Sequence, residues 1–191
     1  NDSLPTLPHC DTVKHNNNHL FTLHNRGNLS IFYKLNEDYI PWQEITIANT
    51  ETYDGERLWD ILDYAVNGDY LVLLDRPING ESRLVIFSID EYNNYNFYQA
   101  VSLNLPFTHK GSADFAHLKF SNNQIVVGTH TFNNVNIAQV IQVYTAAASG
   151  LWSSTEFVSL PPTSSRSPIP ALEFDINKNF NNGSTWISTN N

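Results

Sequence analysis

The 191-residue chain is 41% hydrophobic and 13% aromatic, which excludes a largely disordered protein because a sizeable core can be buried. Ten Lys and Arg stand against nineteen Asp and Glu, and this net charge of −9 argues against nucleic-acid binding, since phosphates need clustered cations. No apolar run approaches the about 18 residues of a membrane span, so we expect no membrane insertion. The single Cys10 excludes an internal disulfide and a Cys-based zinc cluster.

Taken in chain order, the predicted elements repeat one pattern of four strands separated by turns rich in Asn, Gly and Asp. The first repeat, 9–48, has predicted strands at 10–13, 19–23, 28–33 and 42–47. The second, 58–106, has them at 62–66, 70–74, 83–88 and 97–105. The third, 113–161, has them at 116–120, 124–128, 138–144 and 156–160. A partial fourth repeat, 171–191, has two, at 172–176 and 185–188.

The period of the repeat predicts the architecture. Equivalent residues His19, Tyr70 and Gln124 lie 51 and 54 positions apart, close to the about 50 residues of one kelch-type propeller blade. We therefore expect an all-β fold, a β-propeller of four-stranded antiparallel blades with about three full blades and a partial one. Residues 57–62 also fit one helical turn, with apolar residues three or four apart, and this is the alternative for that segment.

The strand order resembles the β-propeller superfamily, with kelch-like and sialidase-like blades. Residues 179–186 resemble the Asp-box of sialidases, Ser-x-Asp-x-Gly-x-Thr-Trp, because Gly183, Thr185 and Trp186 match it. Asn179 and Asn181 stand where the box has Ser and Asp, and the subfamily stays open. The resemblance implies a structural role for the box, which pins a hairpin and packs its Trp between blades.

The ends of the chain predict an incomplete ring. Residues 1–8 resemble the blade-ending segments 103–106 and 159–162, which predicts the last strand of a preceding or closing blade. The fourth repeat supplies only two strands, so the ring lacks a strand and exposes edges that native proteins avoid. We expect further blades of the same chain or a ring-completing partner chain, with a four-bladed closure as the alternative.

Catalytic and metal chemistry lack a clear signal. His15 and His19 are four apart, but on strands that spacing does not make the side chains converge, so we expect no metal and no cofactor. A sialidase-like hydrolase would need several arginines to clamp a carboxylate, whereas this chain has five in all. Arg76 and Arg166 fall in predicted loops, and no nucleophile or phosphate-binding motif occurs.

Binding residues are expected on the segments that connect the repeats and on one aromatic, Asn-rich hairpin, because loops on a rigid scaffold carry recognition. The predicted ligand-binding residues are Tyr53, Asp54, Tyr92, Tyr95, Tyr98, His109, Asp114 and Arg166. Trp42 and Trp152 are placed near the starts of last strands, where packing between blades is the favoured interpretation.

These features favour a non-catalytic binding module that recognises a protein or a glycan through its blade-connecting loops. The alternatives are a fragment of a propeller glycosidase and a structural module of a larger assembly. The acidic composition, the sequons at Asn1, Asn28 and Asn182, and the missing initiator Met favour an extracellular or cell-surface location for a processed chain or a piece of a longer one.

Overall fold

A computed structural model shows that the chain has an all-β fold. The structure describes residues 12–47, 57–76, 82–103, 116–121, 123–133, 136–164, 172–176 and 185–189. Every regular element within these ranges is a β-strand, and the strands form three four-stranded antiparallel sheets and one two-stranded hairpin. The predicted fold class is confirmed at this level.

Each four-stranded sheet is built from consecutive strands in sequence order. Sheet 1 contains β1 (Thr12–Asn16), β2 (His19–His24), β3 (Asn28–Leu35) and β4 (Asp38–Thr46). Sheet 2 contains β5 (Ile61–Asn67), β6 (Tyr70–Asp75), β7 (Arg83–Ile89) and β8 (Tyr95–Ser102). Sheet 3 contains β9 (Ala116–Ser121), β10 (Gln124–Asn133), β11 (Asn136–Ala146) and β12 (Trp152–Ser164). The hairpin contains β13 (Leu172–Ile176) and β14 (Thr185–Thr189).

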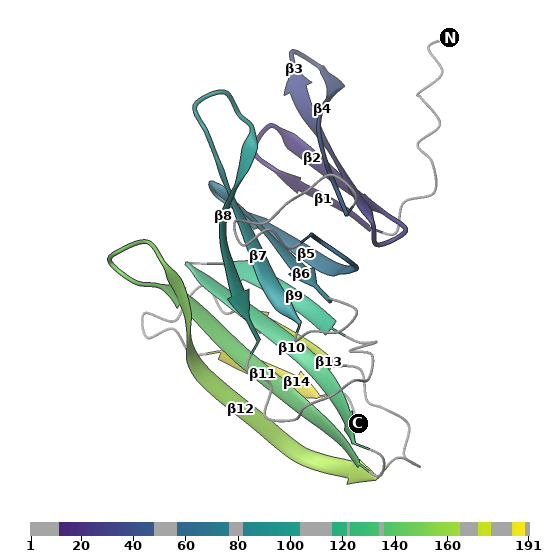
Figure 1. The fold of residues 1–191 in the computed structure, drawn as a ribbon, viewed down its shortest axis with the longest axis vertical. Helices are drawn as coiled ribbons and strands as arrows, with labels where there is room; N and C mark the ends of the chain where they lie inside the picture. The colour runs from purple at the N-terminus through teal and green to yellow at the C-terminus, as the bar shows by residue number, and fades with distance from the viewer. Residues whose placement is uncertain are drawn as a thin grey trace.

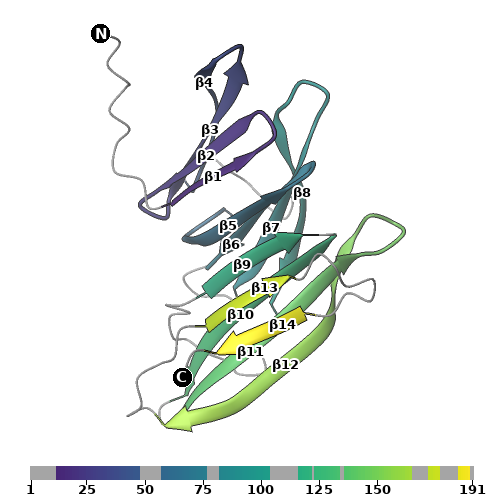
Figure 2. The same cartoon turned by 180° about the vertical axis from the view of Figure 1, so that it is seen from behind.

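The sheets follow one another along the long axis of the molecule, from sheet 1 through sheet 2 to sheet 3 (Figure 1). The view from behind shows the β13–β14 hairpin beside sheet 3 (Figure 2). The first strands β1, β5, β9 and β13 are successive neighbours across the sheets. This arrangement is propeller-like, and the described strands form an open stack rather than a closed ring.

Tight turns at one end of each sheet explain why consecutive strands pair. Asn17, Gly68 and Asn123 turn the chain between the first and second strands, and Asn36 and Asn93 do so between the third and fourth in sheets 1 and 2. All five have positive φ, a region that Gly and Asn tolerate better than other residues. We call this end the hairpin face. The opposite end, where β1, β5 and β9 begin, is the connector face.

The same irregularity recurs between the third and fourth strands of every sheet. The register shifts between Ile31 and Phe32, between Ile86 and Phe87, and between Val143 and Tyr144. Because the bulges coincide, the sheets can be aligned residue by residue through their strand pairings. A bulge bends its strand and re-aims the side chains beside it.

Two apolar cores fill the spaces between the sheets. One joins sheets 1 and 2 through buried residues such as Phe21, Leu71 and Tyr95. The other joins sheets 2 and 3 through Val72, Ile125 and Trp152. Sheet 2 is covered on both faces, which explains why Leu71 to Leu74 form a continuous apolar run instead of alternating with polar residues.

Two sequence predictions differ from the observed elements. The fourth strands begin earlier than predicted, at Asp38, Tyr95 and Trp152, because the turns before them are short. In sheet 1 the sequence contains Pro41, which lacks a backbone N–H and is tolerated in β4 because β4 is an edge strand with one side that has no neighbouring strand in the sheet. Residues 57–62 do not form the alternative helical turn, since β5 already begins at Ile61. The predicted strand at 1–8 and most of the Asp-box-like segment lie outside the described residues.

Candidate functional site

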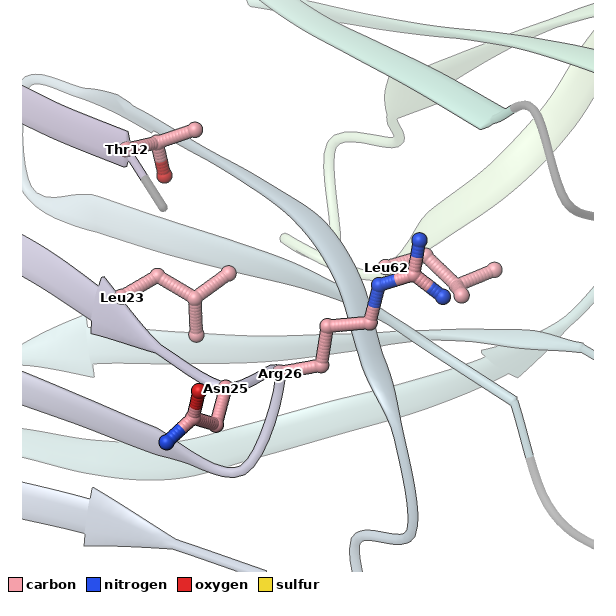
Figure 3. Close-up of a pocket in the computed structure, with 5 residues that line it drawn as sticks. All are labelled: Thr12, Leu23, Asn25, Arg26 and Leu62. Atoms are coloured by element: carbon pink, nitrogen blue, oxygen red, sulfur yellow. The ribbon is translucent and has the colours of Figure 1, made fainter. Parts of the chain in front are cut away.

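An open depression of about 510 Å³ lies on the connector face, at the junction of sheets 1 and 2. Its lining combines a hydroxyl, an amide and a guanidinium with two leucines, from Thr12, Leu23, Asn25, Arg26 and Leu62. The Arg26 side chain extends from the β2–β3 turn toward Leu62 of sheet 2 (Figure 3). The depression therefore offers hydrogen-bonding groups next to apolar surface.

The turn that carries Asn25 and Arg26 is held in an uncommon backbone conformation. Both residues have positive φ, of 49° and 54°, which Asn tolerates but which costs an Arg about 1–2 kcal/mol. Two hydrogen bonds oppose this cost: the Gly27 N–H donates to the His24 carbonyl at 3.0 Å, and the Ile61 N–H donates to the Arg26 carbonyl at 2.7 Å. The second bond links the turn directly to sheet 2, so the position of Arg26 is fixed by both sheets.

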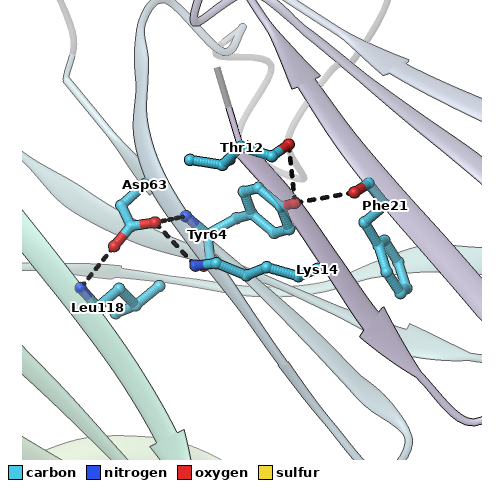
Figure 4. A network of polar contacts seen from close by, with 6 residues as sticks. All are labelled: Thr12, Lys14, Phe21, Asp63, Tyr64 and Leu118. Carbon is cyan, nitrogen blue, oxygen red and sulfur yellow. Dashed lines mark hydrogen bonds and ion pairs between the residues drawn. The ribbon is translucent and has the colours of Figure 1, made fainter. Parts of the chain in front are cut away.

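A polar network behind the depression joins the first strands of all three sheets (Figure 4). Lys14 of β1 forms an ion pair with Asp63 of β5 at 2.9 Å and donates to the Tyr64 carbonyl. The other oxygen of Asp63 accepts a hydrogen bond from the Leu118 N–H of β9 at 2.8 Å. The Tyr64 hydroxyl donates to the Phe21 carbonyl at 3.0 Å, back in sheet 1. Asp63 thus connects sheet 2 to both of its neighbours.

A second network holds the segment that enters sheet 2 at the connector face. The fully buried Asp75 accepts hydrogen bonds from the backbone N–H groups of Trp59 and Asp60, at 2.8 and 3.1 Å. Asp75 also pairs with Arg83 at 3.0 Å, and Arg83 donates to the Arg57 carbonyl at 2.8 Å. The carboxylate thus fixes the backbone of Trp59 and Asp60, while the Trp59 side chain stays exposed.

Of the predicted binding residues, Tyr92 is exposed, and it lies on the hairpin face. Its turn is organised by Asp90, whose carboxylate accepts hydrogen bonds from the N–H groups of Tyr92 and Asn94, both at 2.9 Å. The hydrogen bond from the Asn94 backbone is the main reason that the pKa of Asp90 lies below its usual value. Tyr53, Asp54, His109, Asp114 and Arg166 lie outside the described residues.

Tyr95 and Tyr98 lie in the contacts between sheets. The Gln43 side chain of sheet 1 donates to the Tyr95 carbonyl and accepts from the Tyr95 N–H, both at 2.8 Å. Gln99 repeats this clamp one sheet further, donating to the Trp152 carbonyl at 3.0 Å and accepting from its N–H at 2.8 Å. Tyr98 packs against Tyr70, with ring centroids 5.8 Å apart. Burial raises the pKa of Tyr95 to about 12.

The residue before each glutamine adds a further contact. The Trp42 indole N–H donates to the Asn93 carbonyl at 2.9 Å, and the Tyr98 hydroxyl lies against Gly150, the equivalent turn residue of sheet 3. We call Trp42–Gln43 and Tyr98–Gln99 the aromatic–glutamine pairs. Trp152 packs between sheets as predicted, against Phe120 at 5.4 Å, but it is equivalent to Tyr39 and Tyr95 rather than to Trp42.

Sequence reasoning missed both the aromatic–glutamine pairs and the depression. A signal for the pairs exists: Tyr39-x-x-Trp42-Gln43, Tyr95-x-x-Tyr98-Gln99 and Trp152-x-x-Thr155-Glu156 recur at spacings of 56 and 57 residues. Comparing the ends of the predicted repeats instead of their first turns would have found it. No comparable signal marks Asn25 and Arg26, because their role depends on the neighbouring sheet.

Comparisons with known proteins add no family. No model of a known protein family matches the sequence, and no curated protein matches it either. The class of this protein therefore rests on its structure: an all-β protein of stacked four-stranded sheets with a polar depression between the first two.

The described residues show neither a metal-binding cluster nor a membrane-spanning helix. Among them, no three His, Cys, Asp or Glu side chains gather closely enough to hold a metal ion. His15 is exposed while His19 is buried against Tyr33 and Tyr95. Within the same part of the chain, no helix has the length and apolar character that crossing a membrane requires.

Proposed function

We propose that this chain is a non-catalytic binding module of the β-propeller superfamily, which recognises a protein or glycan ligand at its connector face. The depression beside Arg26 supports this proposal most directly. Its volume of about 510 Å³ falls in the range of small-molecule sites, about 300–1,000 Å³, and suits one or two sugar rings better than a flat protein surface.

The chemistry of the lining favours a saccharide within these two ligand classes. Arg26, Asn25 and Thr12 offer donors and acceptors for hydroxyl groups, while the half-buried Leu62 offers apolar surface for the C–H face of a ring and Leu23 lies buried beneath it. The backbone bond from Ile61 to Arg26 supports a preformed site, and preformed sites lose less conformational entropy on binding.

Replacing Arg26 by Gly tests whether its side chain contributes to saccharide binding without being needed for folding. Arg26→Gly removes the guanidinium, and relief of the positive-φ cost offsets the loss of its side-chain interactions, so we expect the variant to stay folded. Binding to the saccharide selected on an array of immobilised oligosaccharides should weaken at least about tenfold, which is about 1.4 kcal/mol. Isothermal titration calorimetry measures binding, and thermal unfolding shows whether the variant is folded.

The matched control is Tyr92→Ala, which removes an exposed side chain on the opposite face and should leave saccharide binding unchanged. An array on which no saccharide binds, or an Arg26→Gly variant with the parental affinity, would contradict the glycan assignment. Binding lost in Tyr92→Ala and retained in Arg26→Gly would move the site to the hairpin face.

We also propose an extracellular or cell-surface location, supported by the acidic composition. Of the three sequons, Asn28 lies within the described residues, at the start of β3, where its side-chain oxygen is buried. A glycan is therefore expected at Asn1 or Asn182 and not at Asn28. Mass spectrometry of peptides from the secreted protein, before and after enzymatic deglycosylation, tests this expectation.

A further inference from the structure

Two positions that face the preceding sheet are buried in sheets 2 and 3 but exposed in sheet 1, although Thr22 on the same face of sheet 1 is buried. Val13 is 51% exposed, whereas its register equivalents Tyr64 and Leu118 are 0% and 2% exposed. Tyr39 is 38% exposed, whereas Tyr95 and Trp152 are each 2% exposed. At these two positions the residues are apolar or aromatic in all three sheets, and they are exposed in sheet 1, where none of the described sheets covers them.

Two further apolar residues on this face of sheet 1 match the covered interfaces, whereas His15, Lys34 and Glu44 stand where sheet 2 has Val66, Ile89 and Ala100. Leu20 and Phe32 are half-buried at the positions of the buried Leu71 and Phe87. Ser30 is polar, but sheet 3 has the 3% exposed Gln142 at that position, so a polar residue there is compatible with coverage. We call Val13, Leu20, Phe32 and Tyr39 the open face.

From this match we infer that the open face is a docking surface for another four-stranded β-sheet, one whose outer strand carries an aromatic–glutamine pair. The inference extends an interface that the molecule already uses twice, between sheets 1 and 2 and between sheets 2 and 3. In both, the glutamine amide binds the backbone N–H and carbonyl of one aromatic residue, Tyr95 or Trp152. Tyr39 is the third residue at that position and is the backbone to which the incoming glutamine would bind.

The occupant is a sheet from outside this chain's described repeats and not a second copy. Both aromatic–glutamine pairs of the chain already bind its own sheets, at Tyr95 and at Trp152. The third repeat has Thr155–Glu156 at that position, and a carboxylate cannot donate the hydrogen bond that a backbone carbonyl accepts. A copy of this chain therefore has no free pair to offer.

Site-specific photocrosslinking in the cells that produce the protein tests the inference. The full chain carries p-benzoylphenylalanine in place of Tyr39 or, in a second variant, in place of Val13, so that failure of one variant to fold does not end the test. The matched control places the same group at Tyr92, which is exposed on the hairpin face. Crosslinked peptides are sequenced by mass spectrometry.

The inference expects both open-face positions to capture the same β-strand peptide with an aromatic residue followed by Gln, and Tyr92 not to capture it. Crosslinks to this chain's own Trp42–Gln43 or Tyr98–Gln99 segments would overturn it in favour of a second copy. Capture of peptides without such a pair, or no capture at Tyr39 and Val13 in folded protein, would also overturn it. None of these outcomes depends on the ligand of the connector face.

Discussion

Two glutamines join the sheets through their side-chain amides. Gln43 and Gln99 each satisfy one N–H and one carbonyl on the neighbouring sheet, at 2.8–3.0 Å. The amide donates from its nitrogen and accepts at its oxygen at the same time, whereas a carboxylate lacks the donor and an ammonium lacks the acceptor. The glutamines at positions 43 and 99 therefore match the paired N–H and carbonyl groups of Tyr95 and Trp152 that they bind.

Gln43→Glu should destabilise the protein by about 1–3 kcal/mol, because the Tyr95 carbonyl loses its donor and faces a carboxylate oxygen. Urea unfolding at neutral pH measures the loss. The control is Glu44→Gln, at the exposed neighbour on β4, where a change within about 0.5 kcal/mol is expected. A loss in Gln43→Glu no larger than the change in Glu44→Gln would contradict the amide clamp.

His19 should make stability depend on pH. It packs between Tyr33 and Tyr95, and burial lowers the pKa of His19 below its ordinary value of 6.5, although a hydrogen bond with the Asn93 backbone opposes this shift. The unfolded chain therefore binds a proton below about pH 6.5 that the folded chain does not, so stability decreases as the pH falls from about 6.5 toward the folded pKa.

Urea midpoints measured from pH 7.5 down to pH 5 test this dependence. His19→Gln removes the titrating group, so its midpoint should change less with pH over that range than the midpoint of the parent protein. If both proteins lose stability equally below pH 6.5, another group is responsible for the loss.

At the scale of elements, the turns between third and fourth strands fix how far each fourth strand extends toward its neighbour. Gly150 has φ of +85°, and a Cβ built there would lie 2.6 Å from the Tyr98 hydroxyl of sheet 2. Gly68 also has positive φ, +56°, but a Cβ there would have no neighbour within 4 Å. Substitution of Gly68 therefore adds backbone strain alone, whereas substitution of Gly150 adds backbone strain and a clash with the neighbouring sheet.

Gly150→Ala should destabilise the protein by about 2–4 kcal/mol, from the left-handed conformation and from displacement of Tyr98. Gly68→Ala should cost only the backbone term, about 1–2 kcal/mol. Thermal and urea unfolding of both variants measure the difference. A Gly68→Ala loss as large as that of Gly150→Ala would contradict the packing of Tyr98 against this turn.

At the scale of the whole molecule, local sequence signals predicted the sheets well and the contacts between sheets poorly. Asn and Gly at the turns, together with β-branched and aromatic runs, predicted the strands, because hairpins depend on neighbouring residues. Pro41 concealed the start of β4, since its tolerance depends on lying at an edge.

The candidate site was harder to predict for the same reason. Arg26 reaches sheet 2 only because the Ile61 N–H binds its carbonyl, a contact between residues 35 positions apart in the sequence. Tyr95 belongs to a conspicuous aromatic segment and was predicted to bind ligand, yet its ring is buried against His19 and Phe21 of sheet 1, which are far away in the sequence. Sequence composition alone does not distinguish an exposed aromatic residue from one placed between sheets.

The same outer-strand amide clamp locks sheet 1 to sheet 2 and sheet 2 to sheet 3. Amide hydrogen exchange of Gln43→Ala and Gln99→Ala, followed at Tyr95 and Trp152, tests this clamp most directly. We expect both amides to be protected in the parent protein, with Gln43→Ala accelerating exchange at Tyr95 alone and Gln99→Ala at Trp152 alone. Fast exchange at both amides in the parent, or no selective change in the variants, would contradict the stacked arrangement.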